Sequence, residues 1–135
     1  MVDLAELKRI NAWLQAAAAA RTQADEGYVF ELFALPAEGT VEDALARYTA
    51  GTNWQVSVSD ATWSEVEAAL GLWFGETAEA SEVLSALFAS ATKVRRLEIS
   101  APPGEWLKPW YEASWDDFIL ASPKGRVLLH LGVSD

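Results

Sequence analysis

The only histidine of the chain, His130, is the first residue whose side chain could carry chemistry. An imidazole can act as a general base or bind a metal ion, because its pKa lies close to neutral pH. The sequence has no cysteine and no second histidine, so a transition-metal site would need an unusual set of carboxylates. We therefore interpret His130 as a half-exposed strand residue and expect no cofactor.

Carboxyl groups are the second source of chemistry. Glu31 lies inside an apolar segment, and burial without a partner would raise its pKa. A neighbouring strand carries two arginines that could pair with it, so a second candidate polar site consists of Glu31, Arg95, Arg96 and His130. Asp116 and Asp117 are adjacent in a predicted strand. Their side chains must face opposite sides of the sheet and cannot act together.

The aromatic residues before the last two strands form the most unusual stretch. It begins with Pro102-Pro103-Gly104 and interleaves aromatic with charged residues. The candidate binding surface contains Trp106, Trp110, Tyr111, Glu112, Trp115 and Asp116. Large aromatic rings with acidic neighbours can make a sugar-stacking platform, a cation-binding patch or a protein interface. The alternative is a loop that folds back as a lid over an open sheet face.

The composition limits the classes of partner. The chain has 135 residues, 51% of them hydrophobic, which predicts a single domain over residues 1–135 with a substantial core. Its net charge of −10 would repel nucleic-acid phosphate and anionic lipid, so we expect neither partner. The charge suits a basic protein partner or simply solubility. No phosphate-binding glycine loop and no nucleophile-elbow motif is present.

The periodicity of apolar residues predicts the elements that must position these side chains. We expect helices over residues 3–22, 41–50, 61–74 and about 77–91, with Thr40 and Asp43 as a capping box and Asp60 as the third helix's cap. We expect strands over 28–35, 53–59 and 93–100, then an antiparallel hairpin of 118–121 and 127–133 joined by Ser122-Pro123-Lys124-Gly125.

This order, α-β-α-β-α-α-β-β-β, predicts an α+β fold. We expect one five-stranded sheet, mixed or antiparallel, with helices mainly on one face and a C-terminal β-hairpin. The strand at 28–35 is apolar on both faces, which places it inside the sheet. The acidic N-terminal segment reads as a mature helix rather than a secretory signal, and no apolar run is long enough to span a membrane.

Size, acidity and the absence of cysteine are typical of small bacterial interaction proteins, including immunity proteins, secretion chaperones and adaptors. We therefore expect a cytoplasmic, non-enzymatic protein-interaction domain whose partner is a basic protein or a second copy of the chain. One alternative is a small-ligand-binding domain with a Trp-lined pocket. The other is an enzyme that uses Glu31 or His130 with a distant carboxylate.

Overall fold

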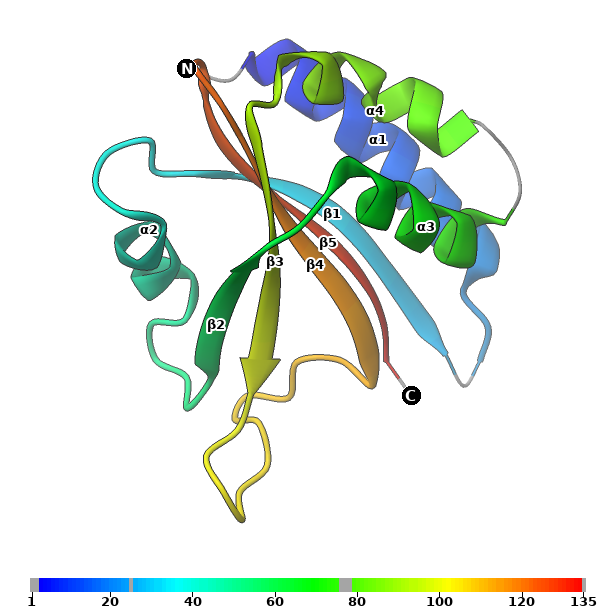
Figure 1. The fold of residues 1–135 in the computed structure, drawn as a ribbon. Helices are drawn as coiled ribbons and strands as arrows, with labels where there is room; N and C mark the ends of the chain where they lie inside the picture. Colours follow the sequence, from blue (N-terminus) through cyan, green and yellow to red (C-terminus); the bar gives the residue numbers. More distant parts are fainter. Residues whose placement is uncertain (1–2, 25, 76–78, 135) are drawn as a thin grey trace.

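The computed structural model describes residues 3–24, 26–75 and 79–134, without the side chains of residues 86 and 88. Within these ranges the chain is an α+β fold with four helices and one five-stranded antiparallel sheet (Figure 1). The elements in chain order are α1 (Leu4–Arg21), β1 (Gly27–Leu35), α2 (Val41–Tyr48), β2 (Gln55–Asp60), α3 (Trp63–Phe74), α4 (Glu79–Ser90), β3 (Lys93–Ser100), β4 (Ser114–Ser122) and β5 (Gly125–Ser134).

The strands are ordered β1-β5-β4-β3-β2, and every neighbouring pair is antiparallel. The predicted element order and C-terminal hairpin are confirmed. The predicted interior position of the first strand is wrong, because β1 pairs only with β5 and forms an edge. Both faces of β1 are nevertheless covered: Phe30 belongs to the core beneath the helices, and Phe33 packs against Tyr48 of α2 on the other face.

Local hydrogen bonds define the helix starts. The Thr40 hydroxyl accepts from the backbone N–H of Asp43, whose carboxylate accepts from Thr40 N–H, so the predicted capping box is confirmed. The helix expected from residue 61 instead begins after Thr62, because β2 continues through Asp60 opposite Arg95. The expected start of the fourth helix at residue 77 lies outside the described residues.

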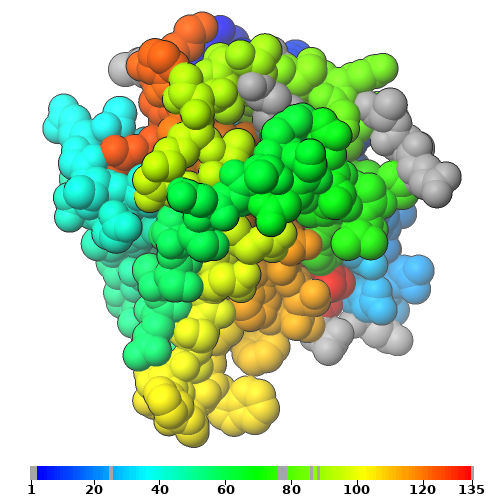
Figure 2. Space-filling view, in the orientation of Figure 1, coloured from blue at the N-terminus to red at the C-terminus, as the bar shows by residue number. Residues whose placement is uncertain are grey.

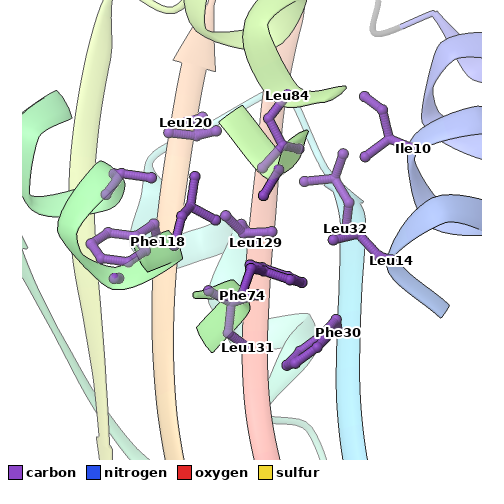
Figure 3. Close-up of a cluster of buried hydrophobic side chains, with 14 of the residues drawn as sticks. Ile10, Leu14, Phe30, Leu32, Phe74, Leu84, Phe118, Leu120, Leu129 and Leu131 are labelled. Carbon is purple, nitrogen blue, oxygen red and sulfur yellow. The ribbon is translucent and has the colours of Figure 1, made fainter. Parts of the chain in front are cut away.

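The first face of the sheet is covered by α1, α3 and α4 (Figure 1). Fully buried helix side chains such as Ile10, Leu14 and Leu84 share one hydrophobic cluster with strand residues. Figure 3 shows Ile10 and Leu14 beside Leu32 of β1, with Leu129 and Phe118 farther along the sheet. Burial of each such side chain contributes roughly 1.5–3 kcal/mol of hydrophobic free energy. This core makes the first face a closed layer. None of the described helices combines the length and apolarity needed to cross a bilayer.

The second face has a smaller apolar cluster. Leu45 of α2 packs there with Leu97, Ile119 and Leu128 from three neighbouring strands. The segment between β3 and β4, residues 101–113, which we call the aromatic loop, adds Leu107 and Tyr111 to the same cluster. The second face is therefore covered by one short helix and one irregular loop, and these two segments carry the candidate site.

Candidate binding surface and the polar network beneath it

Two tryptophans of the aromatic loop face the solvent. Trp106 is 76% exposed and Trp110 is 54% exposed, and their ring centroids lie 6.4 Å apart. Figure 2 shows the loop, in yellow, projecting from one end of the molecule. We call Trp106 and Trp110 the Trp pair. Full burial of rings of this size would contribute several kcal/mol of hydrophobic free energy, so their joint exposure makes the Trp pair a candidate contact surface.

The loop is tied to the segment just before β2. Asn53 donates its side-chain N–H to the Trp106 carbonyl at 2.8 Å and accepts from Lys108 N–H at 2.6 Å. Its own backbone N–H donates to the Lys108 carbonyl at 3.0 Å. The Trp54 indole N–H donates to the Pro109 carbonyl at 2.7 Å. These four bonds span residues 106–109, so the backbone that carries the Trp pair is held in one arrangement.

Four buried polar side chains and the half-buried Tyr48 lie beneath the loop, and we call them the polar network: Tyr48, Tyr111, Glu112, Asp117 and His130. His130 Nδ1 lies 2.6 Å from Asp117 Oδ1, and Glu112 Oε1 lies 3.5 Å from His130 Nε2. The Tyr111 hydroxyl donates to Asp117 Oδ2 at 2.5 Å. The Tyr48 hydroxyl lies 2.9 Å from the Tyr111 hydroxyl. The network joins α2, the loop and the two central strands.

Neighbouring groups define the protonation of the network. Burial alone would lower the pKa of His130, but its contacts with Asp117 and Glu112 outweigh burial and raise the pKa to about 9. The imidazole is therefore charged at neutral pH. Burial and the nearby Asp117 charge raise the pKa of Tyr111 far above its usual range. Tyr111 thus stays a neutral donor to Asp117, and the Tyr48 hydroxyl must donate to Tyr111.

Strand alternation and one glycine make room for this network. Val127, Leu129 and Leu131 face the helices, so His130 and Gly132 face the opposite side. A Cβ added at Gly132 would lie 2.8 Å from both His130 Nε2 and Glu112 Cγ. Glu112 can therefore approach the imidazole only because residue 132 has no side chain. The Ser134 hydroxyl holds the other Glu112 oxygen at 2.9 Å.

The arrangement suits structural support rather than catalysis. Asp117 has no exposed surface and His130 is 4% exposed, so a substrate cannot reach the pair. The two carboxylates contact opposite nitrogens of one ring, which keeps them apart. Among the described residues, no group of three His, Cys, Asp or Glu side chains is arranged to hold a metal ion. The network's chemical capacity is to fix the loop through charge-assisted hydrogen bonds.

The structure divides the predicted binding surface. Trp106 and Trp110 are exposed, as described above. Tyr111 and Glu112 are buried in the polar network, and Trp115 is half-buried against the second-face cluster. Asp116 lies on the first face, where it accepts from the Trp73 indole at 2.8 Å. The loop therefore has two parts: its buried residues cover the sheet as a lid, and its two tryptophans point outward.

The second predicted polar set is also divided. Glu31 lies opposite His130 in the β1–β5 pairing, so these two are neighbours on the second face. Arg96 instead lies on the first face, 2.8 Å from Asp116 and above the Phe118 ring. Arg95 lies on the second face, opposite Ile119. The four residues do not converge. His130 is buried rather than half-exposed, because Tyr111 and Glu112 cover it.

Sequence reasoning missed Asp117 as the partner of His130, although a signal was present. A two-residue turn, Pro123-Lys124, joins the paired residues Ser122 and Gly125. Counting outward from that pair places Asp117 opposite His130, on the same face of the sheet. Tyr48 was also missed, and no short-range pattern connects it with residues 63 to 82 positions later in the chain.

The sequence matches no protein-family model and no curated protein.

Proposed function

We propose that this chain is a non-enzymatic protein-interaction domain that docks a basic protein through the Trp pair. The observation that carries the proposal is the side-by-side exposure of Trp106 and Trp110 on a hydrogen-bonded loop. Tryptophan is enriched among interface residues whose truncation costs 2 kcal/mol or more of binding energy. A cytoplasmic location, in keeping with the absence of cysteine, is part of the same proposal.

Anchoring of the loop supports this proposal energetically. Association costs free energy whenever side chains and loops must be ordered on binding. Here the backbone bonds to Asn53 and the contacts of Tyr111 and Glu112 with the polar network hold the loop before a partner arrives. The Trp pair can then contribute its contact area to affinity with little ordering cost.

Charge supports a basic partner. The chain carries 20 acidic and 10 basic residues, so its long-range field attracts positively charged proteins and repels anionic ones. On the loop itself the exposed charges of Glu105 and Lys108 offset each other, so the attraction comes from the acidic excess of the whole chain. Lysine and arginine side chains of a partner can also bind over tryptophan rings through cation–π contacts. Raising the salt concentration should therefore weaken the complex.

The alternative functions lack comparable support. A small-ligand pocket would need the tryptophans around a cavity, whereas the Trp pair stands on the surface. One hollow of about 670 Å³ is bordered instead by Tyr28, Trp73 and Asp116, with no residue of the loop segment 101–113. An enzyme based on His130 would need access to a ring that Tyr111 and Glu112 cover.

The test compares variants against a purified partner. A partner recovered from extracts of the native host on immobilised protein is purified, and its dissociation constant is measured by calorimetry. The double variant Trp106→Ala/Trp110→Ala should bind at least 30-fold more weakly than the unsubstituted chain, the equivalent of about 2 kcal/mol. Leu4→Ala is the matched control, because Leu4 is an exposed apolar residue and the first residue of α1. Figure 1 shows α1 starting at the end of the sheet away from the aromatic loop. Equal affinity of the double variant and the control would overturn the proposal.

A further inference from the structure

The outer edge of β2 carries unpaired backbone groups. The Ala61 N–H donates to the Val94 carbonyl at 3.1 Å, so these two residues form a hydrogen-bonded pair. In an antiparallel ladder such pairs recur at every second residue, so Ser59 and Ser57 are also hydrogen-bonded to β3. Val58, between these two serines, and Val56, on the other side of Ser57, must then direct their N–H and C=O groups away from β3. The Trp54 N–H agrees with this alternation, because it is bound by the Thr52 hydroxyl rather than by β3.

The opposite edge of the sheet is capped by side chains at two residues. On β1, the Leu32 N–H donates to the Asn11 side-chain oxygen at 2.7 Å, and the Leu32 carbonyl accepts from the Asn11 amide at 2.8 Å. The Tyr28 N–H donates to the Thr22 hydroxyl at 3.2 Å. Proteins commonly block edge strands in this way against pairing with other chains. In the described ranges, Val56 and Val58 have no such cap.

The open edge adjoins the Trp pair. Asn53 and Trp54, which bind the aromatic loop, come directly before β2 in the chain. Figure 1 shows the loop and the start of β2 at the same end of the sheet. A chain segment paired with β2 would therefore run toward the loop that carries the Trp pair. The open strand edge and the exposed aromatic pair therefore lie at one end of the sheet, joined through Asn53 and Trp54.

We propose that the outer edge of β2 receives an extended segment of a basic protein, which adds a sixth strand to the sheet. This inference rests on the proposed function and names how the partner binds. The added strand would form up to four backbone hydrogen bonds with Val56 and Val58, since each offers one donor and one acceptor. The net charge of −10 favours a basic segment over a second copy of this chain, because a second copy would carry the same charge and be repelled.

The side chains of β2 define the pattern of the segment. Val56 and Val58 lie half-buried on the second face, and Ser57 and Ser59 lie exposed on the other. Glu98, also exposed, is paired with Ser57 on β3. A complementary segment therefore alternates apolar residues beside the valines with lysine or arginine beside Ser57 and Glu98.

The experiment uses a displayed library of random 12-residue peptides. Peptides are selected on the full chain and counter-selected on Trp106→Ala/Trp110→Ala, and a selected peptide is synthesised. Hydrogen exchange of backbone amides is then followed by NMR in the free and the saturated protein. We expect the amides of Val56 and Val58 to exchange at least 10-fold more slowly in the complex. The amides of Ser57 and Ser59, already bonded to β3, should change far less.

A backbone variant provides a second readout. Proline at position 58 removes an outward N–H and leaves the bonds to β3 intact, so Val58→Pro should weaken peptide binding at least 10-fold. Ser59→Ala, which changes only an exposed side chain, should bind as the unsubstituted chain does. If Val58→Pro fails to fold, the exchange rates of the unsubstituted protein still decide the question.

The remaining outcomes separate the two proposals. Peptide binding that needs the Trp pair but leaves the Val56 and Val58 amides unprotected would overturn the strand proposal and leave the proposed function standing. Protection of these amides in the free protein that grows with protein concentration would show that a second copy occupies the edge, which also overturns it. A library that yields no peptide dependent on the Trp pair would contradict both proposals.

Discussion

The pH dependence of folding tests the polar network through its only histidine. In the unfolded chain His130 should titrate near its ordinary pKa of 6.5, and in the folded chain near 9. A pKa that is higher in the folded state means that the folded state binds the proton more tightly. The stabilisation is therefore fully present below pH 6.5 and is lost as the pH rises from 6.5 through 9.

The size of the effect follows from the two pKa values. Raising the pKa from 6.5 to about 9 corresponds to a stabilisation of the folded state by about 3 kcal/mol, at roughly 1.4 kcal/mol for each pKa unit. Denaturant unfolding followed by tryptophan fluorescence should show the free energy of unfolding falling by about this amount between pH 6 and pH 9.5. The range is favourable because the chain has one histidine and no cysteine to titrate within it.

The matched control is His130→Gln, which keeps a polar side chain but cannot gain a proton. Its free energy of unfolding should be lower at pH 6 and nearly constant up to pH 9.5. The His130 ring proton signal in NMR gives the folded-state pKa directly, even if the variant is too unstable to study. A folded-state pKa below 7.5, or an equal slope in both proteins, would refute the account of the network.

Five further substitutions test the packing around the network, a helix position and the capped edge of β1. Gly132→Ala should lower the free energy of unfolding by about 1–3 kcal/mol, whereas Gly71→Ala, where an added Cβ meets nothing within 4 Å, should raise it by up to about 1 kcal/mol. Tyr111→Phe should cost about 1–3 kcal/mol and Tyr48→Phe less, since only the former removes the donor to a buried carboxylate oxygen, Asp117 Oδ2. Asn11→Ala should cost about 1–3 kcal/mol by freeing two backbone groups of β1. Denaturant unfolding at pH 7 measures all five, and an unchanged midpoint for Gly132→Ala or Asn11→Ala would contradict the geometry described.

Most of the fold could be predicted from local patterns. Alternating residues such as Trp54, Val56 and Val58 indicated a strand, and Thr40 with Asp43 indicated a helix start. These signals act within a few residues of one another, so a single sequence displays them. The position of β1 could not be predicted in the same way, because apolar faces on a strand show that it is covered without showing what covers it.

The candidate site was less accessible to sequence reasoning. Asp117 could have been paired with His130 by counting from the hairpin turn, because register follows from turn length. The coverage of His130 by Tyr111 and Glu112 could not be found, since the aromatic loop has no periodicity that reveals which side chains turn inward. The division of the loop into a buried half and an exposed half depends on contacts between distant segments.

The central claim is that the Trp pair touches the partner. The most direct measurement is site-specific photo-crosslinking, with a benzophenone side chain in place of Trp110 and, in a matched protein, in place of Leu4. If the Trp pair touches the partner, position 110 should give a covalent cross-link to the purified partner and position 4 should give none. A cross-link from position 4 with none from position 110 would contradict the claim.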